Sequence, residues 1–324
     1  MRFSIIIPVC NVAAELPRTM ASLQAQTCRD YEIVLVDDGS TDGSAQLVDS
    51  YADVATVIHQ PNSGVVAARQ KGFAASKGEW IVFVDGDDKL VPDALSSISC
   101  AINRQDCEIV QYGYTMVSDG KDAASCGQDP EGCKSAEWII KNSARTPLDY
   151  LGMCIWNKCY RRDVAAHAFE DVGDVRISHS EDGLYAFAAL LHAKNICFLG
   201  VSLYCYVLRS SSAVHRVNLA IVNERTKFLE RVRRLAEESG RMTMDQISRM
   251  IDFHAYQGCC YAFLMLKRNH ASWPQVRQVL GELGKCEFFL RPNPEVNSMK
   301  RKLMYFLVRH PCLYFMAAHC GIIR

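Results

Sequence analysis

The chain has 324 residues, of which 49% are hydrophobic and 22% charged, and its formal net charge at pH 7 is zero. This composition is that of a folded globular protein, and it excludes intrinsic disorder and fibrous repeats. Single cores rarely grow beyond about 250 residues, so we expect a principal domain with a smaller second region.

The charges are distributed unevenly along the chain. Residues 1–215 contain 18 Lys and Arg against 27 Asp and Glu, whereas residues 216–324 contain 18 against 9. An acidic first part and a basic second part predict surfaces that meet different partners. The alternative is that the second part consists of several solvated helices.

The 15 cysteines are an odd number, and no two of them have the Cys-x-x-Cys spacing of a zinc site. We interpret most of them as small apolar side chains in a reducing compartment. The N-terminal stretch MRFSIIIPVC lacks the long apolar segment and cleavage site of a signal peptide. The sequence therefore predicts a cytoplasmic protein.

Short β-branched runs alternate with helical patterns in the first part of the chain. Strands are expected at 4–9, 32–37, 56–59, 80–85 and 109–114, with helices between them at about 14–24, 44–51, 65–76 and 92–104. This alternation predicts the α/β class, with a mainly parallel central sheet flanked by helices. Ligands of such sheets bind beyond the carboxyl ends of the strands.

Acidic residues gather at two of these strand ends. The second strand ends in Asp37 and Asp38, and the fourth runs into DGDD at 85–88. Their carboxylates would repel one another unless a cation or hydrogen-bond donors lie nearby. One acidic loop can be no more than a helix cap, but two at the same sheet edge indicate a site.

The remainder of the chain divides into three stretches. Residues 115–150 show no regular pattern and are expected to form an irregular excursion over the sheet. An apolar helix is predicted up to about residue 191, followed by strands at 196–199 and 203–207. Helices are predicted over about 217–240 and 244–267 and from 272 onward. The predicted organisation is an α/β domain at 1–215 and a helical region at 216–324.

The tail begins with the basic run KRK at 300–302 and continues as an apolar, aromatic stretch. Residues 303–323 are long enough to span a bilayer, but RHP at 309–311 places a charge and a helix-breaking proline in the middle. We therefore expect segment 300–324 to lie on an anionic membrane surface or to bind a partner. The alternative is a helix packed on the protein's own core.

Six stretches form a recognisable series. Three are close to one another in the first part of the chain: IIIPVCN at 5–11, EIVLVDDGSTDGS at 32–44 and NSGVVAARQKGFAASKGEWIVFVDGDD at 62–88. Three weaker ones follow: IWNKCYRR at 155–162, SEDG at 180–183 and YVLRSSS at 206–212. In this order they resemble the family 2 inverting glycosyltransferases, which have the nucleotide-binding GT-A fold. The resemblance implies transfer of a sugar from a nucleotide-sugar, expected to be a UDP-sugar, to an acceptor hydroxyl.

The resemblance also implies a metal site. Asp85 and Asp87 match the family's DxD motif, in which Asp87 would hold the metal and Asp85 would contact the ribose or help to hold the cation. His215 would be a further ligand, and the alternative is that this lone histidine is structural. Mg²⁺ or Mn²⁺ binds hard oxygen ligands and can offset the charge of a leaving diphosphate. The alternative for both aspartates is a pair of loop-capping acids.

The nucleotide pocket is expected around the ends of the first strands. By resemblance, Asp37 or Asp38 accepts a hydrogen bond from the base. The other expected contacts to base, ribose and phosphates are Pro8, Asn11, Glu15, Arg69, Asp85, Gly86 and Arg209. Arginine suits a phosphate because its guanidinium fork matches two oxygens. The family usually has asparagine after the arginine at 69, where this chain has Gln70.

Inversion requires in-line attack by the acceptor and one general base to take its proton. Glu181 and Asp182 match the family's ED motif, and we assign the base to Asp182, with Glu181 as the second choice. The alternative is that both cap the helix that follows. Trp156 is expected either to stack on a sugar or to belong to the core.

The sequence thus predicts a metal-dependent hexosyltransferase of cell-surface polysaccharide or glycan assembly. Its expected partners are a glycan or lipid-linked acceptor and an anionic surface at the inner face of the cell membrane, with no nucleic acid. One rival is a non-catalytic nucleotide-sugar-binding subunit of an assembly complex, which would not need a base. Another is a nucleotidyltransferase, whose glycine-rich loop after the first strand is replaced here by PVCN at 8–11.

Overall fold

The computed structural model describes residues 1–118, 121–126, 131–173, 177, 180–208, 221–268, 272–284, 303, 306–308 and 310–314. For 121–126, 221–223 and 268 it describes the backbone alone. Two of the predicted site residues, Arg209 and His215, lie outside these ranges, as does the basic run at 300–302.

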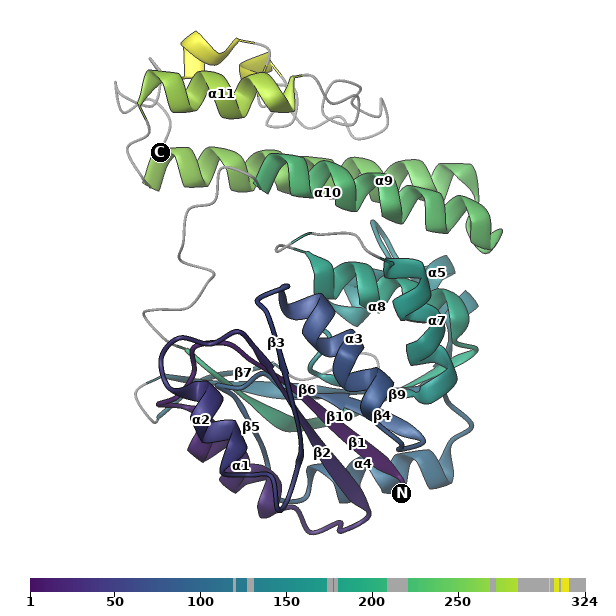
Figure 1. Ribbon diagram of the computed structural model, residues 1–324. Helices are drawn as coiled ribbons and strands as arrows, with labels where there is room; N and C mark the ends of the chain where they lie inside the picture. Colours follow the sequence, from purple (N-terminus) through teal and green to yellow (C-terminus); the bar gives the residue numbers. More distant parts are fainter. Residues whose placement is uncertain are drawn as a thin grey trace.

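A ten-stranded sheet forms the centre of the lower part of the molecule in Figure 1. Its N-terminal half is parallel, with the order β3 (Thr56–Gln60), β2 (Tyr31–Asp38), β1 (Phe3–Val9) and β4 (Trp80–Phe83). The connecting helices are α1 (Leu16–Gln24), α2 (Ser44–Asp49) and α3 (Val65–Ala75). These elements are the predicted ones, so the α/β class with a helix-flanked central sheet is confirmed.

The other half of the sheet is mixed. β9 (Lys158–Arg161) lies between β4 and β6 (Ile109–Ser118) and is antiparallel to both. β10 (Asn195–Val207) is parallel to β6, and the short β5 (Lys89–Leu90) pairs with it in antiparallel fashion. The helix α4 (Ala94–Arg104) precedes β6. The predicted parallel pattern therefore describes the first half, and β9 makes the whole sheet mixed.

The segment expected to be irregular, 115–150, is largely regular where it is described. β6 extends to Ser118, β7 (Lys121–Cys126) pairs with β6, and β8 (Gly132–Ser135) pairs with β10. Two helices follow, α5 (Ala136–Asn142) and α6 (Leu148–Leu151). That prediction was wrong because these elements are too short to show a period. The strands expected at 196–199 and 203–207 are one strand with register shifts near Leu199 and Ser202.

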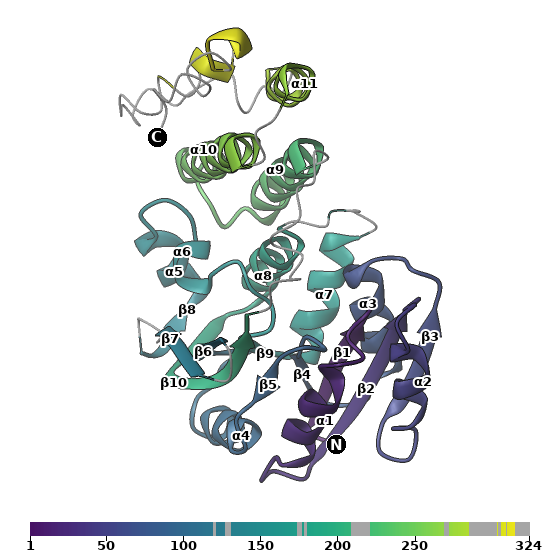
Figure 2. The same cartoon turned by 90° about the vertical axis from the view of Figure 1, so that its left-hand side faces the viewer.

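A stack of helices covers one end of the sheet, and Figures 1 and 2 show it as layers. α7 (Arg162–Val172) and α8 (Glu181–His192) lie next to the sheet, and α9 (Ile221–Ser239) and α10 (Met244–Arg268) lie above α8. Above α10 lies α11 (Trp273–Leu283), which starts with a capping box between Ser272 and Gln275. Within the described ranges, no helix combines the length and apolarity that crossing a bilayer requires.

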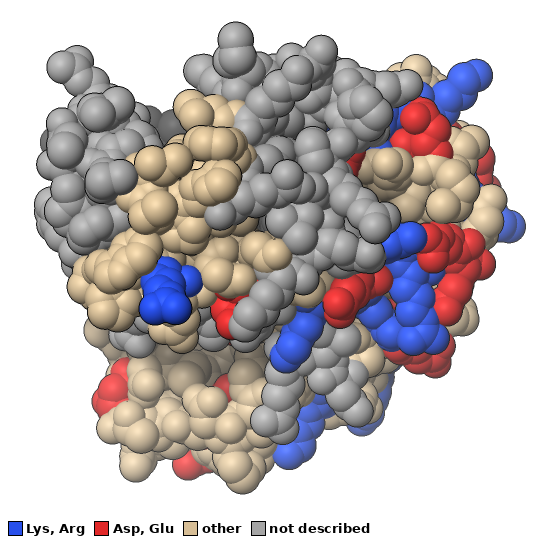
Figure 3. Space-filling view, turned by 90° about the horizontal axis from the view of Figure 1, so that it is seen from above, with Lys and Arg blue, Asp and Glu red and all other residues tan. Residues whose placement is uncertain are grey.

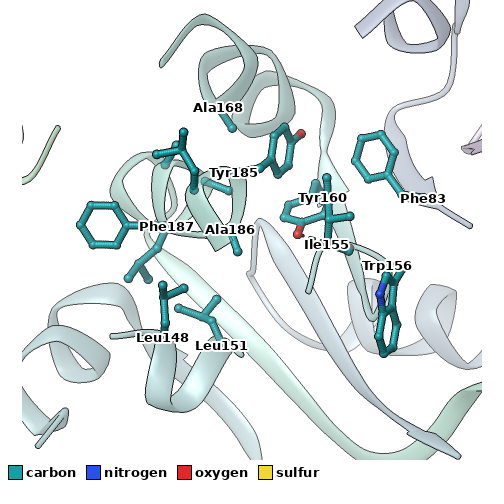
Figure 4. Close-up of a cluster of buried hydrophobic side chains, with 14 of the residues drawn as sticks. Phe83, Leu148, Leu151, Ile155, Trp156, Tyr160, Ala168, Tyr185, Ala186 and Phe187 are labelled. Carbon is teal, nitrogen blue, oxygen red and sulfur yellow. Dashed lines mark hydrogen bonds between the residues drawn. The ribbon is translucent and has the colours of Figure 1, made fainter. Parts of the chain in front are cut away.

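Aromatic side chains fix α8 on the sheet (Figure 4). Tyr185 of α8 meets Tyr160 of β9 edge to face at 5.3 Å and Phe83 of β4 at 5.6 Å between ring centroids. Such pairs stabilise a core beyond their buried area. Trp156 is 6% exposed and stacks on Tyr204 at 4.5 Å. This tryptophan therefore belongs to the core.

Candidate active site

One buried arginine joins the two acidic motifs. Arg69, on α3, is 4% exposed. Its Nη2 donates to Asp85 Oδ1 at 2.9 Å, and its Nη1 donates to Asp182 Oδ1 at 2.5 Å. A buried guanidinium is costly unless carboxylates compensate its charge. The loop after β4 and the start of α8, far apart in sequence, are therefore tied to each other at a single point.

The carboxyl groups after β4 are crowded. Burial raises the pKa of Asp85 to about 6 in spite of Arg69, and repulsion from Asp182 and Asp87 adds to the effect. Burial also raises the pKa of Asp88 to about 8, together with repulsion from Asp85 and Asp87. These shifts show an excess of negative charge at this edge of the sheet.

The donor set at this edge fits a divalent cation. Magnesium sites of this kind use one or two carboxylates, such as Asp85 and Asp87, and complete their shell with substrate phosphates and water. Among the described residues, no group of three or more His, Cys, Asp or Glu side chains could hold an ion.

Asp88 has a structural role that the sequence analysis did not assign. Its buried carboxylate accepts hydrogen bonds from Tyr204 Oη at 2.8 Å and from the Val207 backbone N at 2.7 Å. It thereby ties the acidic loop to the end of β10, just before the stretch that contains Arg209. The sequence did contain a signal for this role: the DxD motif needs only Asp85 and Asp87, so the third acid of the DGDD run, Asp88, was free for another function.

The ends of β1 and β4 pack closely against each other. A Cβ on Gly86 would lie 3.0 Å from Val12 Cγ2 and 3.2 Å from the Pro8 carbonyl oxygen, so a larger residue would push the loops apart. Asn11 has a φ of 56°, and its Oδ1 accepts a hydrogen bond from Thr41 N at 2.8 Å. Gly86 thus lies against Pro8, and Asn11 is held against the loop that follows β2, while their contacts with a nucleotide stay a prediction.

Glu15 occupies the N-cap position of α1, a few residues beyond the end of β1. It is half-buried there. Gln70, which stands in place of the family's asparagine, donates to the Gly173 carbonyl at 3.4 Å.

The carboxylates of Asp37 and Asp38 are both buried and already hydrogen-bonded to the protein. Asp37 Oδ2 lies 3.0 Å from His59 Nδ1, and its Oδ1 accepts from the Ser40 backbone N at 3.1 Å. Asp38 accepts three hydrogen bonds around the start of α3, from Gln60 Nε2, Ser63 N and Gly64 N. A contact with a base would use a remaining lone pair, so the role of either residue stays a prediction.

Glu181 and Asp182 are the first two residues of α8. Carboxylates are favoured there by the helix dipole, so the expected capping effect and a catalytic role are compatible. Burial, followed by repulsion from Asp182, raises the pKa of Glu181 to about 8. Burial thereby favours the protonated form of Glu181, which makes it the weaker candidate for the base. Asp182, which Arg69 holds beside Asp85, stays the first choice.

Two kinds of sequence comparison support a family assignment. The family model for glycosyl transferase family 2 matches residues 4–169. EpsH, a candidate glycosyltransferase of Bacillus subtilis (strain 168), is 31% identical over 250 residues, which are 72% of this chain and 71% of EpsH. YibD, an uncharacterized glycosyltransferase of Escherichia coli (strain K12), is 26% identical over 318 residues, 92% of this chain and 89% of YibD.

Solved structures agree in fold. TarS 1-349 of S. aureus in complex with UDP has a TM-score of 0.74 at 19% identity, covering 99% of this chain and 92% of that chain. The mannosyltransferase PcManGT of Pyrobaculum calidifontis, solved with GDP-Man and Mn²⁺, has a TM-score of 0.53 at 14% identity, covering 98% and 86%. At these identities the likeness concerns the fold alone. Since the family model covers half of the chain and EpsH most of it, this protein belongs to glycosyl transferase family 2.

Proposed function

We propose that this family 2 glycosyltransferase moves a sugar from a UDP-sugar to an acceptor hydroxyl with inversion, with the help of Mg²⁺ or Mn²⁺. The observation that carries the proposal is the Arg69 bridge between Asp85 and Asp182. The same buried guanidinium group therefore holds both Asp85, which is expected on the side of the sugar donor, and Asp182, the candidate base. A UDP donor is supported by TarS, which shares the fold and was solved with UDP and with UDP-GlcNAc.

The donor would lie across the ends of β1, β2 and β4. Pro8, Asn11 and Glu15, with Asp37 or Asp38, would surround the base and ribose. Asp87 would hold the cation, and Asp85 would contact the ribose or help to hold the cation. When bound, the cation would offset the charge of the departing diphosphate. For Arg209 as a phosphate contact and His215 as a further metal ligand, the support is the sequence pattern alone.

The acceptor would approach from the side of α8. Its hydroxyl oxygen attacks the anomeric carbon, the bond from that carbon to the diphosphate oxygen breaks, and the hydroxyl proton passes to the Asp182 carboxylate. Burial favours the protonated form of Glu181, which would donate a hydrogen bond to the acceptor. Attack opposite the leaving group inverts the anomeric configuration.

Product analysis tests this function. The purified chain is incubated with a panel of UDP-sugars, Mn²⁺ and a set of glycan acceptors, and released UDP is measured. A parallel reaction contains UDP-sugar and added pyrophosphate. We expect UDP and an inverted product. Formation of UTP and sugar 1-phosphate from pyrophosphate would indicate a nucleotidyltransferase, binding without turnover would indicate the non-catalytic subunit, and a retained anomeric configuration would exclude in-line displacement.

We also propose that the acceptor belongs to cell-surface polysaccharide or glycan assembly and that the enzyme works at the inner face of the membrane. The basic run at 300–302 and three exposed apolar side chains after it, Leu303, Phe306 and Leu313, support this location.

The net basic charge of residues 216–324 gives this membrane location less support than the basic run does. Arg233 and Arg234 on α9 are each paired with a glutamate four residues later. Figure 3 shows the molecule from above, and the Lys and Arg side chains drawn on that face are interspersed with Asp and Glu. Attraction to an anionic surface would therefore depend mainly on residues 300–302.

Co-sedimentation with anionic vesicles at low and high salt tests the location. Each basic residue near such a surface contributes about 1 kcal/mol, so the combined change K300E/R301E/K302E should release the protein. A change of Arg233 and Arg234 to glutamate is the matched control and should leave binding weakened far less. Equal binding of the wild type and the triple variant would contradict a tail-dependent anchor.

A further inference from the structure

Three arginines of the helical region reach down to α7 and α8. From α9, Arg225 Nη1 donates to Ser180 Oγ at 2.7 Å, and Arg231 Nε donates to the Asp171 carbonyl at 2.6 Å. After α9, Arg241 Nη1 donates to three carbonyl oxygens at the end of α8, those of Leu190, Leu191 and Ala193. The two ends of α8 are thus each held by an arginine from outside the α/β part.

Ser180 stands directly before Glu181 and Asp182 in an uncommon conformation. Its φ is 75°, in the left-handed region that residues other than glycine rarely adopt. Its side chain does not cap α8. The Oγ instead accepts the hydrogen bond from Arg225. Strained backbone of this kind persists when surrounding contacts hold it, and it is often found at functional sites.

Arg225 is itself fixed by a buried polar group. Its Nη2 donates to the His254 carbonyl oxygen at 3.1 Å, and its guanidinium lies 4.7 Å from the centre of the Phe228 ring. His254 is 1% exposed, and its Nε2 lies 3.1 Å from Thr146 Oγ1. Ser180 is therefore linked through Arg225 of α9 to His254 of α10, and through His254 to the loop that precedes α6.

At the other end of α8, Arg241 performs the task of a C-cap. The last carbonyl groups of a helix lack partners within the helix and need donors from elsewhere. Arg241 supplies one nitrogen to three of them, while its Nη2 pairs with Glu137 of α5. The position of α8 along its own axis is thereby fixed from both ends.

We propose that the helical region positions the base for catalysis, with Arg225 and Arg241 holding the ends of α8 so that Asp182 stays against Arg69. The catalytic part of this inference rests on the proposed role of Asp182. Arg225 is a positioning residue, because it contacts Ser180 and not the reacting groups. The helical region would then be a working part of the enzyme and not only an anchor.

Hydrogen exchange of the intact chain tests the structural part. Arg225→Ala and Ser180→Ala remove opposite partners of the same hydrogen bond, and Arg233→Ala, on the exposed side of the same helix, is the control. We expect amides in the first turns of α8 to exchange about tenfold faster in the first two variants, because a hydrogen bond to a charged group is lost. Arg233→Ala should exchange as the wild type does.

Kinetics test the catalytic part. With UDP-sugar and Mn²⁺, kcat should fall about tenfold to a hundredfold in Arg225→Ala and Ser180→Ala, since small displacements of reacting groups have effects of this size. The Kd of UDP should be unchanged, because the nucleotide site lies at the ends of β1, β2 and β4. The double variant should be no worse than the more affected single variant, since both remove one contact.

The outcomes separate the two proposals. Exchange in α8 and kcat within twofold of the wild type in both variants would overturn the positioning role, as would an equal effect of Arg233→Ala. If the variants loosen α8 but the wild type turns over no nucleotide sugar, α8 is held as described while the proposed function, and with it the catalytic part of the inference, fails. Ser180→Ala keeps the test decisive if Arg225→Ala does not fold.

Discussion

The α/β part and the helical region use arginine in opposite ways. Arg69 is buried and joins Asp85 to Asp182 across distant parts of the chain. Arg233 and Arg234 on α9 are exposed by 43% and 63% and pair with glutamates of their own helix. Exposed pairs of this type contribute about 0.3–0.5 kcal/mol, whereas breaking a buried pair is strongly destabilising. Burial, and not the number of charges, therefore distinguishes a site from a solvated face.

Arg225 crosses this division. It lies on the same helix as Arg233 and Arg234, but its partners are the half-buried Ser180 and the buried His254. The division at residue 215, which remains a prediction, thus separates two charge distributions more clearly than it separates two roles. Substitutions in both parts of the molecule test this contrast between buried and exposed charged side chains.

The largest expected effect is at Asp87, the proposed metal ligand. Asp87→Ala should lower turnover by about 10³-fold or more, because a cation contributes several kcal/mol to charge stabilisation in the transition state. Turnover is measured with saturating UDP-sugar and Mn²⁺, and the fold is checked by thermal unfolding. Full activity of the wild type in excess chelator would contradict the metal site.

The next effect separates the two acids of α8. Asp182→Asn keeps the shape and removes the proton acceptor, so the rate should fall by about 10² to 10⁴ while UDP affinity is kept. Glu181→Gln should retain far more activity, because burial favours the protonated form of Glu181, whose shape and hydrogen-bond donor the glutamine keeps. If Glu181→Gln is the more impaired variant, the assignment within the pair is reversed. If neither variant is impaired, the acceptor is deprotonated in another way.

A smaller effect concerns stability in acid. Burial, with a contribution from Arg225, lowers the pKa of His254 to about 3. Below pH 6.5 the unfolded chain gains a proton at this histidine that the folded chain does not, so folding stability falls as the pH decreases. The contribution lost between pH 7 and pH 5 is about 2 kcal/mol, at up to 1.4 kcal/mol per unit.

Urea unfolding of the wild type and His254→Gln at pH 7 and pH 5 measures this contribution. Other titrating groups cancel in the difference between the two proteins. The stability advantage of the wild type should shrink by about 2 kcal/mol at the lower pH. A constant difference would mean that His254 titrates normally in the folded state.

The smallest effect is on the exposed side of α9. Arg233→Ala should change the free energy of unfolding by no more than about 0.5 kcal/mol, since the pair with Glu237 is exposed. Arg225→Ala, on the same helix, should cost more because Ser180 and the His254 carbonyl would lose a buried donor. Equal losses would contradict the contrast between the two faces of α9.

Local information was sufficient for much of this molecule. β1, β2 and β4 were predicted because short β-branched runs alternate with helical periods, and the acidic residues after β2 and β4 followed from the rule on strand ends. The helices α9 and α10 were predicted close to their described ends from their periodicity, and the start of α11 was predicted from a helix-start signal at Ser272. Each of these signals lies within a few neighbouring residues.

Tertiary structure alone decided the remaining features. β9 has four residues, too few for a period, and its place between β4 and β6 depends on pairing across the chain. The joining of Asp85 and Asp182 by Arg69 and of Ser180 by Arg225 depends on how α3 and α9 pack against α8. Such contacts join residues that are close only after the chain has folded, so no local pattern of the sequence contains them.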